Sequence, residues 1–144
     1  MTFGEAFDVQ PFNNLVVTQD MAGAQIKAVL EQQWAACTPP GRSGGATVIL
    51  QVSAGVTYSY DEALACGSRI SNMMLGGTAV QPGTTYKVTL NNFIADGGDS
   101  FPAFTAGTNR VYAPDFDIDA LADYLDANTP PGVAPGPQNR ITKL

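Results

Sequence analysis

The stretch "YKVTLNNFIADGGDSF", residues 86–101, places a strand-like run directly before a polar corner that contains two adjacent glycines. The corner sets Phe93 six residues before Asp99, and Gly97 and Gly98 lie directly in front of that acid. A turn is the simplest interpretation, because glycine adopts backbone conformations that other residues avoid. The alternative is a binding site, in which the bend brings a flat apolar ring and an acceptor for hydroxyl groups together.

A second corner of the same kind lies far upstream, where "PFNN", residues 11–14, precedes the strand-like run 15–18. Each corner by itself is explained by packing plus a turn. Together they predict a clamp, in which Phe12 and Phe93 face each other and Asn14 and Asp99 supply hydrogen bonds. Such a slot suits a nucleobase, because every base has a π-face that stacks on aromatic rings. An ionised aspartate can accept from two vicinal hydroxyls, as on a ribose.

Strand and helix patterns surround these corners. Apolar positions at helical spacing from Ile26 to Trp34 predict a helix that ends before Pro39, and a second stripe predicts a helix over 117–128. Gly76-Gly77 predicts a hairpin turn. Strands are expected over 15–18, 48–52, 56–61, 69–75, 78–80, 85–92 and 140–142. This order predicts an α+β fold with a mixed β-sheet and two main helices, in a single domain over residues 1–144.

Composition excludes several classes of function. The net charge is −6 and the seven basic residues are scattered along the chain, which argues against nucleic-acid binding. No apolar run approaches the roughly 18 residues of a membrane span. Histidine is absent, so neither a Ser-His-Asp nor a Cys-His nucleophile can form, and no histidine can bind a metal. We therefore expect no catalytic residue in this chain.

The remaining candidates for chemistry are two cysteines and a group of acids. Cys37 and Cys66 are expected to be disulfide-bonded or close in space, and the absence of a CxxC motif argues against a metal site. "DFDID", residues 115–119, has the acid spacing of a calcium loop, but Ala120 stands where that loop needs glycine. Acids at the start of a helix explain the pattern better, so no metal is expected.

Several motifs together resemble a known family. They are "VQPFNNLVV", "MAGAQIKAVLE", "ILQVSAGVTYSYD", "YKVTLNNFIADGGDSF" and the closing "NRIT". On these the chain resembles the C-terminal, substrate-binding domain of the 5'-nucleotidase family, which includes periplasmic nucleotidase/UDP-sugar hydrolases and ecto-5'-nucleotidases. The resemblance implies a base stacked between Phe12 and Phe93.

The resemblance also assigns polar contacts within that site. It implies contacts from Asn14 and from Asp99 to the ribose, and a loop contact from Gly45 or Gly44. Asn13 stands where the family usually has glycine, and asparagine tolerates the left-handed conformation better than most residues.

The resemblance further implies a larger parent protein. Its N-terminal phosphoesterase domain would hold two divalent metals through His, Asp and Asn, and neither that domain nor the family's phosphate-binding segment is in this chain. The expected partners are a nucleoside or nucleotide and that N-terminal domain. An extracellular, periplasmic or cell-wall location is expected from the family, although no signal-type segment follows Met1.

Two alternatives remain open at this point. The chain could be a non-catalytic domain of the same fold that recognises another ligand or a protein. The parent could instead hydrolyse nucleotide sugars, cyclic nucleotides or a sulfur compound.

Overall fold

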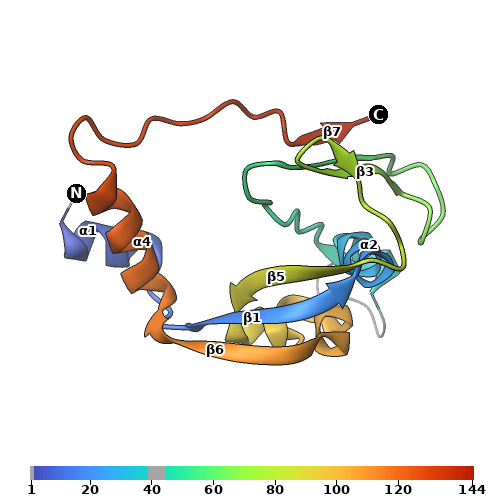
Figure 1. The fold of residues 1–144 in the computed structure, drawn as a ribbon. Helices are drawn as coiled ribbons and strands as arrows, with labels where there is room; N and C mark the ends of the chain where they lie inside the picture. The colour runs from blue at the N-terminus through green and yellow to red at the C-terminus, as the bar shows by residue number, and fades with distance from the viewer. Residues whose placement is uncertain (1, 39–44) are drawn as a thin grey trace.

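Two β-sheets form the frame of the computed structural model, which describes residues 2–38 and 45–144 (Figure 1). The first sheet is antiparallel, in the order β5-β1-β6, and comprises β1 (Leu15–Ala22), β5 (Thr85–Asn91) and β6 (Thr108–Phe116). The second has the order β4-β3-β2-β7 and comprises β2 (Val56–Tyr60), β3 (Ile70–Leu75), β4 (Thr78–Ala79) and β7 (Ile141–Lys143). Because β7 runs parallel to β2 while β3 is antiparallel to it, this sheet is mixed. The α+β prediction is confirmed.

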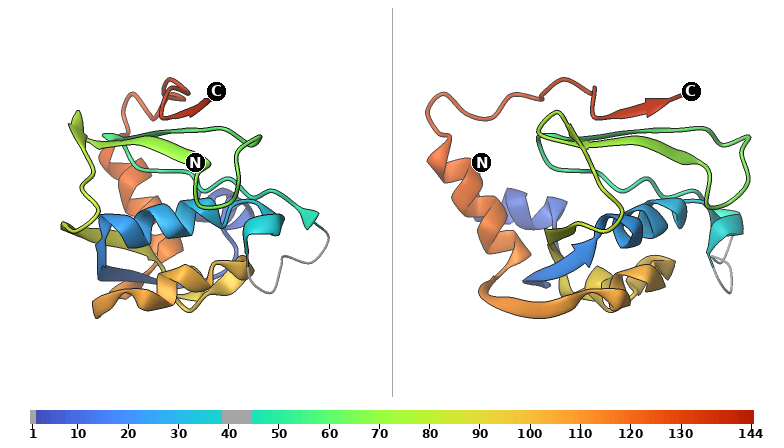
Figure 2. Two further views of the ribbon diagram at one scale, coloured as in Figure 1. Left: turned by 90° about the vertical axis from the view of Figure 1, so that its right-hand side faces the viewer. Right: turned by 45° about the vertical axis from the view of Figure 1, so that its right-hand side comes forward.

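The helices lie around and between these sheets. They are α1 (Phe3–Val9), α2 (Gly23–Glu31), α3 (Asn92–Ala95) and α4 (Asp117–Ala127), with 3-10 turns η1 (Ala35–Cys37), η3 (Gly98–Ser100) and η4 (Pro102–Ala106). Figure 2 shows α2 between the two sheets, and η4 packs directly against α2. The helix α1 begins with a capping box, in which Thr2 and Glu5 satisfy each other's backbone N–H groups.

Two hydrophobic clusters meet at α2. One contains Met21, Val29, Phe101 and Phe104, and joins α2 to β1 and to η4. The other contains Leu30, Trp34, Tyr58 and Ile70, and joins α2 to the second sheet. Ile26 packs against both clusters. The two sheets are therefore held together mainly through opposite faces of one short helix.

Most of the expected elements are confirmed, including β1, β2, β5, α4 and β7. The hairpin at Gly76-Gly77 is also confirmed, since both glycines have positive φ values (57° and 79°) and join β3 to β4. The first helix is shorter than expected, because α2 ends at Glu31 and Trp34 follows it in an irregular turn.

The expected strand over 48–52 is wrong. Among the described residues this segment pairs with no strand of either sheet. Its backbone bonds go elsewhere: the N–H of Val48 donates to the Gln33 carbonyl (2.9 Å) and that of Leu50 to Gln33 Oε1 (2.8 Å). One buried glutamine thus takes the place of a neighbouring strand. The apolar side chains of the segment still pack on the core.

The elements not expected from the sequence include α1 and β6. The helix α1 is only seven residues long and precedes the first corner. The strand β6 contains Asn109, Pro114 and Asp115, which belong to residue types that are depleted in strands. It forms because it pairs with β1 along one side of the first sheet.

Candidate functional site

Strand pairing brings the two corners of the sequence to one edge of the first sheet. Since β1 and β5 are antiparallel, the start of β1 lies beside the end of β5, with Val16 opposite Asn91. The N–H of Leu15 donates to the Asn92 side-chain oxygen (2.8 Å), which ties the two segments directly. Phe12 lies shortly before Leu15 and Phe93 lies directly after Asn92, so both phenylalanines are near this junction. We call Phe12, Asn14, Phe93, Gly98 and Asp99 the corner site.

The paired asparagines at 91–92 have separate structural roles. Asn91 caps α3, because its side-chain oxygen accepts from the N–H of Ile94 (2.9 Å). Asn92 holds the start of β1, as described above. Together they fix the position of Phe93, the residue that follows them. Neither role was expected from the sequence.

Both phenylalanine rings of the corner site are open to solvent. Phe12 is 74% exposed and Phe93 is 47% exposed, whereas Phe101 and Phe104 nearby in the sequence are buried in the core. Removing one face of an exposed aromatic ring from water costs little free energy, so such a ring can stack on a flat ligand. The exposure that the clamp requires is therefore present for both rings.

The glycine pair answers the question raised by the quoted stretch. Gly97 adopts a left-handed conformation, with φ of 87°, and so turns the chain after α3. Gly98 lies against Phe93: a Cβ at this position would be 2.6 Å from Cε1 of the ring and 2.6 Å from the Phe93 carbonyl oxygen. The bend therefore brings the backbone of Gly98 into contact with the Phe93 ring. Asp99, with a φ of 50°, follows and is exposed to solvent.

Asn14 is held by an acid that is distant in sequence. Its backbone N–H donates to Asp117 Oδ1 (3.2 Å), its Nδ2 donates to Asp117 Oδ2 (3.4 Å), and its carbonyl accepts from the Asp117 N–H (2.8 Å). Asp117 is buried at the start of α4, so this acid positions Asn14 in addition to opening the helix. Asn13 adopts a left-handed φ of 47°, the conformation expected where the family usually has glycine.

Gly45 is not linked to the corner site by these contacts. It precedes the segment that bonds to Gln33, it has a φ of 66°, and no atom lies within 4 Å of where its Cβ would be. The alternative position, Gly44, lies outside the described residues. A ligand contact from this loop remains a proposal.

Arg110 of β6 was missed by the sequence analysis. Its guanidinium bonds to Gln19, to Asp96 and to the Ala95 carbonyl, directly before the glycine pair. Hydrogen bonding to Tyr112, and then to Asp96, raises the pKa of Arg110. No local pattern marks this residue, because its partners come from β1 and from the end of α3.

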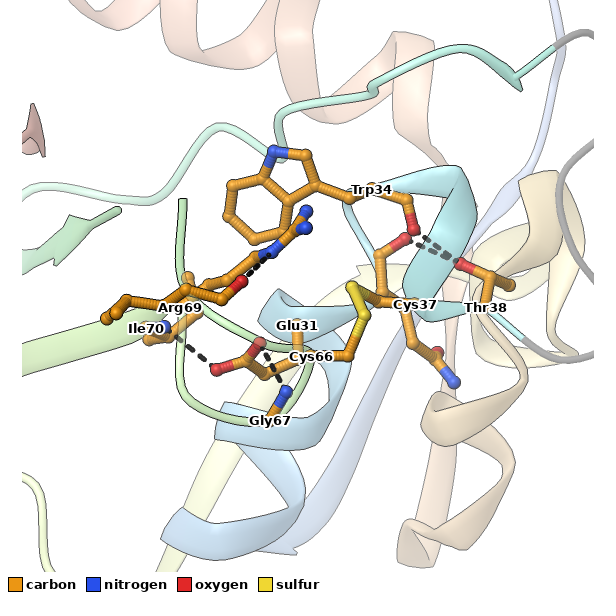
Figure 3. Close-up of a disulfide and its surroundings, with 10 residues drawn as sticks. Glu31, Trp34, Cys37, Thr38, Cys66, Gly67, Arg69 and Ile70 are labelled. Carbon is orange, nitrogen blue, oxygen red and sulfur yellow. Dashed lines mark hydrogen bonds between the residues drawn. A yellow bond between two sulfur atoms is a disulfide. The ribbon is translucent and has the colours of Figure 1, made fainter. Parts of the chain in front are cut away.

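The two cysteines form a disulfide in a different part of the molecule (Figure 3). It links η1 to the loop after β2, with the Cα atoms of Cys37 and Cys66 5.3 Å apart. The buried carboxylate of Glu31 accepts from the N–H groups of Gly67 (2.9 Å) in the same loop and of Ile70 (2.8 Å) at the start of β3. This region has a structural role, because it connects α2 to the second sheet.

The described residues contain neither a metal-binding cluster nor a membrane helix. Within 2–38 and 45–144 no group of three or more His, Cys, Asp or Glu side chains could hold an ion. Over the same ranges, no helix is both long enough and apolar enough to span a bilayer.

Comparisons with known proteins agree with this geometry. The sequence profile described as "5'-nucleotidase, C-terminal domain" matches residues 1–106. A 5'-nucleotidase of Vibrio cholerae is 32% identical over 130 residues, covering 90% of this chain and 21% of that protein. Cell wall protein Lmo0130 of Listeria monocytogenes is 32% identical over 128 residues, covering 87% of this chain and 15% of that protein.

A solved structure shares the fold along the whole chain. The crystal structure of a 5'-nucleotidase precursor from Thermus thermophilus superposes with a TM-score of 0.83 and 33% identity, covering 100% of this chain and 28% of that chain. The chain thus spans between about a seventh and somewhat over a quarter of the length of these relatives.

Proposed function

The chain belongs to the family of 5'-nucleotidase C-terminal domains, and from that premise we propose that its corner site binds the nucleoside part of a nucleotide. The observation that supports the proposal is the exposure of Phe12 and Phe93, two residues that flank the paired ends of β1 and β5. A base would stack between them, and the ribose would extend toward Asp99.

The chemistry of the corner site fits such a ligand. Stacking of a base on an aromatic ring contributes about 1–3 kcal/mol per base. The Asp99 carboxylate can accept hydrogen bonds from two ribose hydroxyls. With Nδ2 of Asn14 directed to Asp117, its side-chain oxygen is the atom that would accept from the base. The site thus combines two apolar faces with acceptors at the rim.

In this proposal the domain supplies binding and orientation, and hydrolysis takes place elsewhere in the parent protein. The two divalent metals that the resemblance implies do not fit the described residues, which provide no cluster of ligands for them. Holding the nucleoside positions the phosphate for chemistry by another domain, which is how binding energy accelerates a reaction. The isolated chain is expected to release no phosphate from nucleotides, with or without divalent metal.

The proposal also includes a location outside the cytoplasm. The Cys37–Cys66 disulfide supports it, since such bonds persist mainly in oxidising compartments. The similarity to a protein named as a cell wall protein supports it as well.

The test is a titration of the isotopically labelled chain with adenosine, followed by NMR. We expect amide shifts confined to residues 12–14 and 91–99 and an affinity near millimolar, because the phosphate and metal contacts are absent. Phe93→Ala should weaken binding by roughly 5- to 140-fold, which corresponds to the loss of one stacking face. Leu75→Ala is the control, since Leu75 is 44% exposed but lies in the second sheet.

Two results would decide against the nucleoside site. One is the absence of shifts at the corner site at saturating adenosine while the chain remains folded. The other is equal binding by the Phe93→Ala and Leu75→Ala variants. Either result would favour the alternative, a domain of this fold that recognises another ligand or a protein.

A further inference from the structure

A single arginine fixes the segment that carries Gly97, Gly98 and Asp99. The Arg110 side chain is only 20% exposed, and besides its interaction with Tyr112 its guanidinium donates to three further acceptors. Nη2 donates to the Ala95 carbonyl (2.7 Å), Nη1 to Asp96 Oδ1 (2.5 Å) and Nε to Gln19 Oε1 (3.1 Å). Two of these acceptors belong to the two residues directly before Gly97.

The helix α3 needs this external support. It has only four residues, and a helix of a single turn is not stable alone. Its last carbonyl groups have no partner within the helix, and a cation at a helix C-terminus is favourable. The guanidinium therefore bonds to α3 at its C-terminal end, where the chain enters the glycine bend.

The other end of the same segment is fixed through Gln19 of β1. Gln19 is fully buried and its Nε2 donates to the Phe104 carbonyl (2.9 Å), while its Oε1 accepts from Arg110. Gly107 lies so close to Gln19 that a Cβ there would be 2.3 Å from the side-chain amide. Residues 95–104 are thus anchored to β1 and β6 at both ends.

We propose that Arg110 is a positioning residue for the corner site. By holding Ala95 and Asp96, it sets where Gly98 meets the Phe93 ring and where the Asp99 carboxylate stands. It thereby controls recognition of the ribose hydroxyls without contacting the ligand. The ligand part of this inference rests on the proposed function, whereas the anchoring of residues 97–99 does not.

Lysine cannot replace this arginine. The guanidinium presents several N–H donors in a rigid planar fork, whereas an ammonium group is a compact point charge on a flexible chain. Three acceptors in different directions therefore require arginine. Asp96 is 60% exposed in its side chain, so Asp96→Asn removes the charge of one acceptor without disturbing the core.

The experiment compares Arg110→Lys and Asp96→Asn with the control Arg140→Lys. Arg140 also donates to a backbone carbonyl, that of Val52 (2.8 Å), but it precedes β7 of the second sheet. The first readout is hydrogen exchange and ¹⁵N relaxation at Gly97, Gly98 and Asp99. We expect both to increase in the Arg110→Lys variant, to a smaller extent in Asp96→Asn, and not in the control.

The second readout separates positioning from general destabilisation. The wild-type chain should bind adenosine more tightly than 2',3'-dideoxyadenosine, and Arg110→Lys should reduce this preference by about fivefold, the equivalent of one net hydrogen bond. Affinity for the dideoxy compound should change little. An equal loss for both compounds, or unchanged dynamics at residues 97–99, would overturn the proposal.

Failure of the two proposals can be told apart. If the wild-type chain binds neither compound, the proposed function and the ribose part of this inference both fail. The dynamics at residues 97–99 then still decide whether Arg110 anchors the bend.

Discussion

Replacing Gly98 by alanine tests the contact between the glycine bend and the Phe93 ring. The new Cβ would be 2.6 Å from Cε1 and 2.7 Å from Cδ1 of the ring, and 2.6 Å from the Phe93 carbonyl oxygen. All three distances are shorter than a carbon atom allows. The ring is half exposed and can rotate away, but the carbonyl belongs to the turn of α3 and can move only with the backbone.

The expected cost follows from two opposing effects. Overpacking of this kind costs typically about 1–3 kcal/mol. The φ of Gly98 lies outside the left-handed range, so the folded protein can accommodate the alanine backbone. Alanine also restricts the conformations of the unfolded chain, which raises the free energy of unfolding by about 0.4–1 kcal/mol. The net loss in the free energy of unfolding should therefore lie between about 0 and 2.6 kcal/mol, with a central value of about 1.3 kcal/mol. That central value corresponds to a fall in Tm of roughly 3–5 °C for a chain of this length.

Gly83→Ala is the matched control, since Gly83 also lies outside the left-handed range but has no atom within 4 Å of where its Cβ would be. This variant should be as stable as the wild type or slightly more stable. Urea denaturation, followed by the fluorescence of the buried Trp34, measures both variants. If Gly98→Ala were as stable as Gly83→Ala and left the resonances of the Phe93 ring unchanged, the assigned role of Gly98 would be wrong.

Three further outcomes are expected. Replacing Cys37 and Cys66 by serine removes a link between residues 29 apart and should lower the free energy of unfolding by about 3–4 kcal/mol, and an unchanged urea midpoint would contradict this. Phe101→Ala empties a fully buried position and should cost about 3–5 kcal/mol by the same assay, unlike Phe93→Ala. Hydrogen bonding to Lys87 lowers the pKa of Asp20 below its ordinary 3.8, so this bond stabilises the fold above that pH, and its contribution is lost as the pH falls through the lowered pKa. Asp20→Asn should therefore reduce the acid sensitivity of Tm between about pH 2 and pH 6, and parallel curves for both proteins would refute it.

Local signals in the sequence were sufficient for much of the fold. The stripe that begins at Ile118 predicts α4, and the glycine pair at 76–77 predicts the β3–β4 hairpin. Both signals act over a few residues, because helix periodicity and turn conformation depend on near neighbours. The exposed aromatic corners at Phe12 and Phe93 were recognisable for the same reason.

The errors have a common cause, which is that strands depend on partners elsewhere in the chain. The segment 48–52 is apolar enough for a strand, yet Gln33 takes its hydrogen bonds. The strand β6 has a poor composition, yet β1 offers it a place to pair. Strand propensity reflects the surroundings of a residue more than its backbone preference, so neither outcome could be read from the segment itself.

The sequence by itself determined which residues have the chemistry of a site: two phenylalanines at polar corners, an asparagine, and an acid behind two glycines. Only the tertiary structure decided that the corners meet, through the pairing of Val16 with Asn91. It also decided that Asp117 holds Asn14, 103 residues away, and that Arg110 bonds to Ala95 and Asp96, directly before the glycine bend. Residue chemistry is a local property of the chain. Contacts between distant residues form only where the whole arrangement repays the entropy of bringing them together.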